Sequence, residues 1–350
     1  MTDSKFKLTY FALKGLGESI RYLFAYADVD FEDKRIAQED WPELKESYEY
    51  RQLPVLEVDG KTLNQSVAIA RYLGRRFGLV ASDPFTDALL EALTDNLRDT
   101  QTKLAEAIVK KTPEAIKEGG EAMTFFLTKI EPLAADGFLY GEKNTAVNMT
   151  DSKFKLTYFT LKGLGESIRY LFAYADVDFE DNRIAQADWP TLKESYEYRQ
   201  LPVLEVDGKT LNQSVAIVRY LGKRFGLVAS DPLTDALLEA LTDNLRDIHP
   251  KLRQTFMKKT PEAKKELDDA LEFFLKKTEP LAADGFFYGQ KTATWTDIYF
   301  TGYVEAMSKF IPGALDAYPN LVALTEKVKG KDSVKKYIEN RPEDDWIMPQ

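Results

Sequence analysis

The segment QLPVLEVDGKTLNQSVAIVRYL, residues 200–221, decides the fold of this chain. Its two short apolar runs meet at Asp207-Gly208, a dipeptide that is typical of tight β-hairpins. Asn-Gln-Ser then precedes VAIVRYL, whose apolar spacing indicates an amphipathic helix, and Gly226 marks the end of that helix. The segment therefore predicts a strand, a hairpin, a second strand and a helix.

The residues before this segment predict the other half of a small domain. KFKLTYF, residues 153–159, alternates with the period of a strand, and GLGESIRYLFAYADV, residues 163–177, has helical spacing. FEDNRI, residues 179–184, predicts another strand. The resulting order, β-α-β followed by β-β-α, is that of a thioredoxin-like domain, which we place at residues 153–228.

The residues after the segment have a different composition. Pro232 suits the first turn of a helix, and amphipathic helical segments without strand patterns follow it. Thr294-Trp295-Thr296-Asp297 predicts a capping box at the start of a further helix. We therefore predict an α/β domain followed by an all-helical domain at residues 232–350.

Most of this pattern occurs twice. Residues 149–158, MTDSKFKLTY, repeat residues 1–10, and the match continues at a constant offset of 148. We call residues 1–148 the first copy and residues 149–350 the second copy. Their first hundred residues differ at only eight positions: Ala12/Thr160, Lys34/Asn182, Glu39/Ala187, Glu43/Thr191, Ala70/Val218, Arg75/Lys223, Phe85/Leu233 and Thr100/Ile248.

The first copy is truncated. The copies drift apart from Gln101 and His249 onward, and the 54 residues from Asp297 to Gln350 have no counterpart in the first copy. We predict that this partial tandem duplication contains a thioredoxin-like domain at residues 1–80, a truncated helical domain at 84–140 and a linker at 141–152.

The composition excludes several kinds of chemistry. The 350 residues carry a formal net charge of −10, one histidine and no cysteine. Disulfides, cysteine nucleophiles and Cys-ligated zinc are therefore excluded, and one histidine leaves little for a Ser-His-Asp triad. The negative charge argues against a nucleic-acid partner. Any reaction must use carboxylates, hydroxyls, amides or cations, or a thiol that a ligand brings.

The sequence also carries a prediction about location. No stretch approaches the roughly 18 apolar residues of a membrane span, and the polar start MTDSKFK lacks the hydrophobic centre of a signal peptide. We therefore expect a cytoplasmic protein without a membrane partner.

Four motifs carry a family resemblance: KLTYF, RIAQADWPTLK, QLPVLEVDGKTLNQSVAIVRYL and TWTDIYF. With them the chain resembles the cytosolic glutathione transferases. It is most similar to the sigma-like class, represented by invertebrate transferases and vertebrate glutathione-dependent prostaglandin D synthase. The resemblance covers all of the second copy. In the first copy it covers the thioredoxin-like domain and the first two helical segments.

The resemblance implies a catalytic role for Tyr158. In the family a tyrosine at this position donates a hydrogen bond to the sulfur of glutathione, the co-substrate, and such a bond lowers the pKa of the thiol. Without the resemblance, a tyrosine in an alternating strand is more typical of a core aromatic residue. Tyr10 is its counterpart in the first copy.

The resemblance also implies a set of glutathione-binding residues. Gln213 and Ser214 match residues that recognise the γ-glutamyl carboxylate, although Asn-Gln-Ser alone indicates a helix cap. Leu201-Pro202 matches a cis peptide whose backbone pairs with the cysteinyl part of glutathione, and Trp189 and Lys193 match positions near its glycine end. The first copy repeats these residues as Trp41, Lys45, Leu53, Pro54, Gln65 and Ser66.

Asp247 and its first-copy counterpart Asp99 have a separate implication. They match a helix aspartate that reaches the α-amino group of glutathione in the neighbouring subunit of the dimer. Each site would then need a partner chain or the other copy, so we expect a homodimer or a dimer-like contact between copies. On spacing alone, a solvated acidic helix face is an equal alternative.

Some residues depart from the family pattern. Leu164 stands where the family often has arginine, and Glu197-Tyr198-Arg199 stands where Pro-Phe-Gly is usual. The lost glycine restricts the backbone, and the lost arginine removes a charge near the site. Arg246 and Arg98 interrupt an acidic cluster that binds a divalent metal in some relatives, so we predict no metal.

The leading functional hypothesis is conjugation of glutathione to hydrophobic electrophiles. Glutathione-dependent prostaglandin isomerisation or peroxide reduction are further activities that the resemblance allows. The alternative is a weakly active or non-catalytic binding or structural protein, as with the crystallins that resemble sigma-class transferases. A thiol-disulfide oxidoreductase is excluded because that chemistry needs a cysteine.

Two hypotheses describe the first copy. It forms a dimer-like contact with the second copy or with another chain, or it is the imperfect passenger of a recent duplication or a gene-model join. The segment GEKNTAVNMTDSK contains an in-frame methionine and no sign of a designed linker. From the sequence we favour the second hypothesis.

Overall fold

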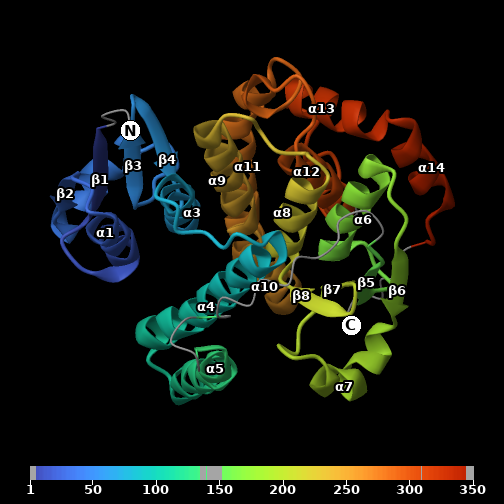
Figure 1. Ribbon diagram of the computed structural model, residues 1–350, viewed down its shortest axis with the longest axis horizontal. Coiled ribbons are helices and arrows are strands. Elements are labelled where there is room, and N and C mark those ends of the chain that lie inside the picture. Colours follow the sequence, from blue (N-terminus) through green and yellow to red (C-terminus); the bar gives the residue numbers. More distant parts are fainter. Residues whose placement is uncertain (1–4, 135–138, 140–151, 309, 344–350) are drawn as a thin grey trace. The chain divides into compact units, whose positions relative to one another are not determined.

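The structure, a computed structural model, describes residues 5–134, 139, 152–308 and 310–343 (Figure 1). Of the predicted linker at residues 141–152, only Ser152 is among them. Contacts group the chain into two compact units, which we describe separately. Unit 1 comprises Met1–Val80, Val228–Phe300 and Gly313–Val328, and unit 2 comprises Ala81–Leu227, Thr301–Pro312 and Lys329–Gln350.

Unit 1 contains the sheet of the first copy, with strand order β2-β1-β3-β4 (Figure 1). β1 is parallel to β2 and antiparallel to β3, which forms a hairpin with β4. Asp59 and Gly60 in the hairpin turn have φ values of 49° and 79°, and a type I′ turn requires both to be positive. The predicted thioredoxin-like order is therefore confirmed. Its elements are β1 Phe6–Phe11, α1 Gly15–Ala27, β2 Glu32–Ile36, η1 Gln38–Asp40, α2 Trp41–Leu44, η2 Lys45–Ser47, β3 Val55–Val58, β4 Lys61–Asn64 and α3 Ser66–Arg76.

The core of this domain continues into a helix of the second copy, α9 (Pro232–Arg246). Leu233, Ala236 and Ala240 of α9 join the same apolar cluster as Phe24 and Tyr72 of the first copy. At the edge of this contact, the guanidinium of Arg75 lies 3.1 Å from the carboxylate of Asp235 and also contacts Glu239. Apolar burial and paired charges thus hold first-copy α3 against second-copy α9 within unit 1.

The remaining helices of unit 1 come from the second copy: α10 His249–Lys258, α11 Pro261–Thr278, η6 Glu279–Ala282, η7 Phe287–Gly289, the first part of α12 (Trp295–Met307) and most of α13 (Pro319–Lys329). Helix α9 begins at Pro232, as predicted, and the carboxylate of Asp231 accepts a hydrogen bond from the Thr234 amide at 2.8 Å. A new helix starts beside Pro250, which lacks an amide hydrogen, whereas Thr102 of the first copy lies within one long helix.

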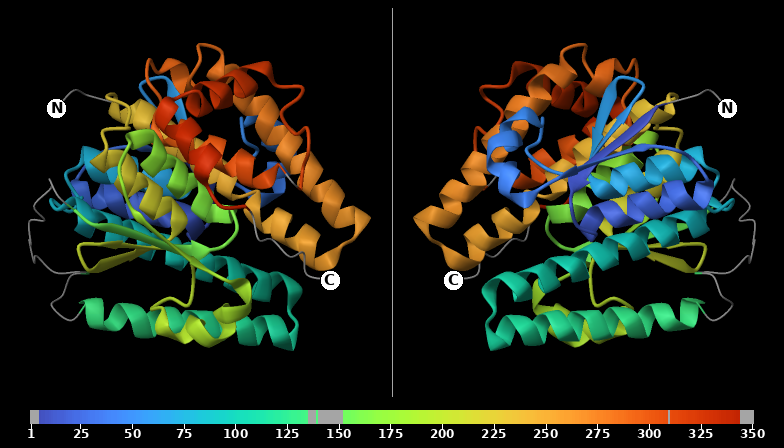
Figure 2. Two further views of the ribbon diagram at one scale, coloured as in Figure 1. Left: turned by 90° about the vertical axis from the view of Figure 1, so that its right-hand side faces the viewer. Right: turned by 90° about the vertical axis from the view of Figure 1, so that its left-hand side faces the viewer.

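Unit 2 repeats the fold with the sheet of the second copy, in the order β6-β5-β7-β8. The long helices α4 and α5 of the first copy run side by side (Figure 2), and α4 packs on α8. Lys223 of α8 pairs with Asp87 and Glu91 of α4 at 2.8 and 3.1 Å. The elements are α4 Pro84–Lys110, α5 Pro113–Ile130, η3 Glu131–Ala134, β5 Phe154–Phe159, α6 Gly163–Ala175, β6 Glu180–Ile184, η4 Gln186–Asp188, α7 Trp189–Leu192, η5 Lys193–Ser195, β7 Val203–Val206, β8 Lys209–Asn212, α8 Ser214–Arg224 and α14 Asp332–Asn340. No described helix has both the length and the apolarity that crossing a membrane requires.

The capping box predicted at Thr294 and Asp297 is present at the start of α12. One carboxylate oxygen of Asp297 accepts from the amide and hydroxyl of Thr294 at 2.7 and 2.6 Å, and the other accepts from the Phe287 amide at 2.9 Å. Asp297 is fully buried. One side chain thus satisfies two buried backbone amides. Ala146 and Val147, the first-copy counterparts of Thr294 and Trp295, lie outside the described residues.

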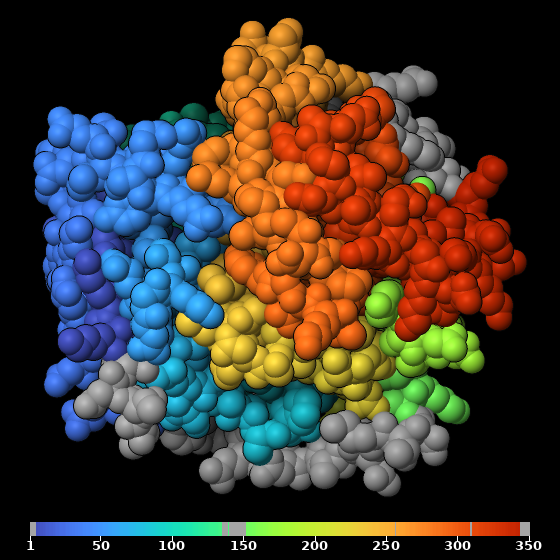
Figure 3. Space-filling model, turned by 90° about the horizontal axis from the view of Figure 1, so that it is seen from above, coloured from blue at the N-terminus to red at the C-terminus, as the bar shows by residue number. Residues whose placement is uncertain are grey.

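Helices α12 and α14 cover α6 of the second copy. The red α14 lies against the green thioredoxin-like domain in the space-filling view (Figure 3). The hydroxyl of Tyr337 donates to Glu166 at 3.1 Å, and Arg341 pairs with Glu166 at 2.5 Å and with Glu305 at 2.6 Å. Lys162, just before α6, also pairs with Glu305 at 2.9 Å. A network of partly buried charges therefore joins the C-terminal helices to the turn between β5 and α6.

Helix α1 has the same sequence as α6 and a different environment. Tyr22 of α1 is 67% exposed, whereas its counterpart Tyr170 is fully buried. Leu13, before α1, is 37% exposed, whereas Leu161 is 5% exposed. The truncation of the first copy removes the residues that would supply an equivalent of α14.

The charge network predicts acid sensitivity at Glu305. Burial raises the pKa of its carboxyl, but hydrogen bonds from Lys162 and Arg341 outweigh that effect and lower the pKa to about 2. Because the folded-state pKa lies below the unfolded one, the stabilisation is complete above the unfolded value of 4.5 and is lost as pH falls towards 2. The loss corresponds to roughly 3 kcal/mol.

Glu305→Gln is therefore expected to destabilise the chain at pH 7 and to converge with the unaltered chain near pH 2. Denaturant unfolding between pH 7 and 2, with hydrogen exchange of α14, measures both effects. Glu339→Gln, at an exposed position of α14, is the matched control. Parallel acid curves for the unaltered chain and Glu305→Gln would contradict the prediction.

Candidate functional site

Tyr158 lies near the end of β5, and the start of α6 holds its hydroxyl. The side chain is 6% exposed, and its oxygen accepts a hydrogen bond from the Leu164 amide at 3.1 Å. In unit 1 the hydroxyl of Tyr10 accepts from the Leu16 amide at 3.0 Å. Because the oxygen is the acceptor in these contacts, the hydroxyl hydrogen can be donated to another group.

Two glycines make this arrangement possible. A Cβ at Gly163, whose φ is +40°, would lie 2.6 Å from the Tyr158 hydroxyl, and a Cβ at Gly165 would lie 2.5 Å from the ring. Side chains at either position would displace the tyrosine. These glycines are not among the predicted site residues, although their place between a strand and a helix is a visible signal.

Arg169 provides a buried positive charge beside the ring of Tyr158. Its guanidinium carbon lies 5.9 Å from the ring centroid, and its Nε donates to Asp181 at 3.1 Å. Burial raises the pKa of Tyr158, and the opposing effects of the Leu164 amide and Arg169 do not reverse this. The phenol therefore stays protonated at neutral pH and remains a hydrogen-bond donor.

Gln213 precedes α8 and lies beside residues of the other copy. Its φ is +66°, which is uncommon for a residue with a side chain. Its Nε2 donates to the Asp99 carboxylate at 2.9 Å, to the Asn96 side-chain oxygen at 2.8 Å and to the Gln200 side-chain oxygen at 3.2 Å. Asp99 and Asn96 belong to α4 of the first copy.

Unit 1 contains the reciprocal arrangement. Gln65 has a φ of +67°, and its Nε2 donates to Asp247 at 2.9 Å and to Asn244 at 2.8 Å, both from the second copy. It also donates to Gln52 at 3.2 Å. The predicted aspartates thus meet the predicted glutamines of the opposite copy.

Four side-chain amides of this arrangement are not among the predicted site residues: Asn96, Asn244, Gln52 and Gln200. Each asparagine lies three positions before its aspartate, a spacing that places both on one helix face and could have revealed it.

The remaining predicted glutathione-binding residues occupy equivalent positions in the two copies. The Leu53–Pro54 and Leu201–Pro202 bonds are both cis, as the resemblance implies. Ser66 and Ser214 begin α3 and α8.

Trp189 begins α7, and its ring lies 5.5 Å from that of Phe159. Trp41 has the same place in the first copy, 5.4 Å from Phe11. Lys45 and Lys193 are exposed.

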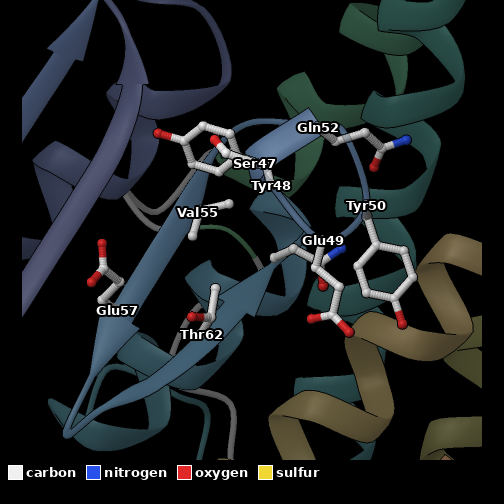
Figure 4. A pocket seen from close by; sticks show the side chains of 9 residues that line it. Ser47, Tyr48, Glu49, Tyr50, Gln52, Val55, Glu57 and Thr62 are labelled. Atoms are coloured by element: carbon white, nitrogen blue, oxygen red, sulfur yellow. The ribbon is translucent and has the colours of Figure 1, made fainter. Parts of the chain in front are cut away.

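A pocket of about 240 Å³ adjoins Gln52 and Asn64 in unit 1. Figure 4 shows Glu57 and Thr62 on the strands at one side of it, and Glu49 and Tyr50 on the loop at the other. The corresponding residues of unit 2 line a pocket of about 360 Å³. Among the described residues, no group of three or more histidine or acidic side chains is placed to hold a metal ion.

Comparisons with known proteins agree with this architecture. The family model of the glutathione S-transferase N-terminal domain matches twice, at residues 6–75 and 154–223, and that of the C-terminal domain matches residues 246–341. The chain is 37% identical over 201 residues to hematopoietic prostaglandin D synthase of Homo sapiens, covering 54% of this chain and 97% of that protein. It is 37% identical over 206 residues to glutathione S-transferase 1 of Ascaris suum, with the same coverage.

A solved structure gives the same result. The prostaglandin synthase D of Nilaparvata lugens is 38% identical, with a TM-score of 0.50 over 55% of this chain and 99% of that one. The matches confirm the predicted fold class, the partial duplication and the sigma-like resemblance. The chain therefore belongs to the glutathione S-transferase family, whose enzymes use glutathione as co-substrate.

Proposed function

We propose that this chain conjugates the thiolate of glutathione to hydrophobic electrophiles, with the hydroxyls of Tyr158 and Tyr10 stabilising the thiolate. The observation that carries the proposal is the buried phenol of Tyr158, which accepts from the Leu164 amide and keeps its own hydrogen to donate. Donation to sulfur favours the thiolate over the thiol. Glutathione brings the sulfur that a chain without cysteine lacks.

The binding residues supply groups that complement the peptide. Gln213 and Ser214, at the start of α8, would offer side-chain and helix-start hydrogen-bond donors to the γ-glutamyl carboxylate. The Asp99 carboxylate would pair with the α-amino group. Trp189 and Lys193 would hold the glycine end, and the backbone of Leu201-Pro202 would pair with the cysteinyl part. Their counterparts would form a second site with Asp247.

The two copies would then complete each other. The bonds Gln65–Asp247 and Gln213–Asp99 support a dimer-like pairing between copies, in which each glutathione site draws residues from both. We therefore propose, against the preference drawn from the sequence alone, that the first copy is a working half. We propose that the first copy has the domain boundaries predicted from its sequence, residues 1–80 and 84–140.

The same thiolate would serve other glutathione-dependent reactions. Because one relative is named a prostaglandin D synthase, isomerisation of a prostaglandin endoperoxide is the second candidate activity. It would use the same tyrosine and glutathione-binding residues.

The test is the rate at which the purified chain conjugates glutathione to an aromatic electrophile with a chloride leaving group. We expect a catalysed rate that saturates with glutathione concentration and exceeds the uncatalysed rate at pH 6.5 to 7, where little free thiolate exists. Retention on immobilised glutathione without catalysed conjugation would instead support a binding or structural protein.

A further inference from the structure

Arg51 and Arg199 have an unusual backbone conformation immediately before the predicted glutathione-binding segments. Their φ values are +53° and +51°, in the left-handed region that favours glycine. The family usually has glycine here, and glycine would adopt this conformation without strain. In both copies an arginine adopts this left-handed conformation, so its side chain is a candidate for a specific role.

Both arginine side chains contact a phenylalanine of the other copy. The guanidinium carbon of Arg199 lies 5.0 Å from the ring centroid of Phe125 on α5, within unit 2. In unit 1 the guanidinium carbon of Arg51 lies 4.6 Å from the ring of Phe273 on α11. These are cation–π geometries, and Arg199 is also held by Glu194 at 2.7 Å.

The helices that carry these phenylalanines differ at eight of their 18 positions. Helix α5 reads PEAIKEGGEAMTFFLTKI and α11 reads PEAKKELDDALEFFLKKT. Both keep the phenylalanine and a lysine four residues later, Lys129 or Lys277, whose ammonium lies 5.6 or 5.9 Å from the same ring. The arrangement is thus the same in two different helix sequences.

The position of each arginine connects this contact to the binding segment. Arg199 is followed directly by Gln200, Leu201 and Pro202, and Gln200 accepts a hydrogen bond from Gln213 at 3.2 Å. A displacement of Arg199 would therefore move residues that the proposed function assigns to glutathione. It would leave the hydrogen bond between Leu164 and Tyr158 in place.

We propose that Arg51 and Arg199 are positioning residues: each fixes its glutathione-binding segment against a phenylalanine of the opposite copy, so that glutathione affinity at one site depends on the other copy's helix. This inference rests on the proposed function. Under this proposal, the arginine that replaces the usual glycine in Glu197-Tyr198-Arg199 supports glutathione binding instead of weakening it.

The experiment isolates one site. In a Tyr10→Phe chain, which retains the Tyr158 site, Phe125→Leu removes the aromatic face and keeps apolar volume. We expect the KM for glutathione to rise about two- to fivefold, the range for an exposed cation–π contact, with kcat nearly unchanged. Phe273→Leu removes the matching ring from the other copy and should leave the KM of the Tyr158 site as it was.

Arg199→Gly supplies an independent arm. Glycine relieves the backbone strain but loses the contact, so the same rise in KM is expected, and Arg199→Lys should restore part of the affinity. An unchanged or lower KM in Phe125→Leu and Arg199→Gly would overturn the inference, as would equal effects of Phe125→Leu and Phe273→Leu. If the unaltered chain catalyses no conjugation, the proposed function fails, and calorimetric glutathione affinity of the same variants still decides the positioning role.

Discussion

Replacing Tyr158 by phenylalanine in a Tyr10→Phe chain is expected to lower the rate of glutathione conjugation at pH 7 about a hundredfold, the usual effect of losing one hydrogen-bond donor to a reacting anion. Phenylalanine keeps the ring that packs against Gly165 and removes only the hydroxyl. The thiol of bound glutathione would then ionise at a higher pH. Initial rates from pH 5.5 to 9 measure both changes.

The pH profile separates this mechanism from a loss of fold. If the hydroxyl stabilises the thiolate, the remaining rate of the variant rises at higher pH than that of the unaltered chain, and the KM for glutathione changes less than kcat. Tyr26→Phe, at a position that is 78% exposed, is the matched control and should conjugate normally. Equal rates in the double variant and the unaltered chain would refute the tyrosine mechanism.

The single variants divide the activity between the copies. Tyr158 lies next to a turn that Glu305 holds through Lys162, whereas Leu13 and Leu16 in the equivalent turn of the first copy are exposed. We therefore expect Tyr158→Phe to lose more activity than Tyr10→Phe.

The local structure around the site could be predicted from the sequence because its causes are local. The Asp207-Gly208 turn, the capping box of Asp297 and the strand and helix periods depend on residues that are close together in the chain. The cis bond at Leu201-Pro202 followed from the family resemblance. These features agree with the structure.

The pairing of the copies could not be predicted in the same way. Gln65 and Gln213 lie in the same local sequence, NQSVAI, so nothing near either glutamine identifies which aspartate it meets. The choice depends on which helix packs against α3 or α8, which is a tertiary property. Arg199 shows a related limit. The sequence marked the missing glycine, but only the structure shows the left-handed backbone and the contact with Phe125.

Removing the carboxylate of Asp297 is expected to destabilise the chain by about 3 kcal/mol or more. Asp297→Ala would leave the amides of Phe287 and Thr294 buried without their partner, and each unsatisfied buried group costs about 1 to 3 kcal/mol. Burial raises the pKa of Asp297 to about 6, so the experiment belongs at pH 7.5, where the carboxylate is ionised. Denaturant unfolding gives the overall effect, and hydrogen exchange of α12 gives the local one.

Two further substitutions serve as a control and as an intermediate case for Asp297→Ala. Asp268→Ala removes an exposed carboxylate from α11, where its pairing with Lys264 is a surface contact, and should change stability by less than about 0.5 kcal/mol. Asp297→Asn keeps one acceptor oxygen and should fall between the other two. If Asp297→Ala unfolded like Asp268→Ala, the capping box would not be what holds α12. Because α12 also carries Glu305, an early loss of α12 in Asp297→Ala should release Lys162 and slow conjugation at Tyr158 before the rest of the chain unfolds.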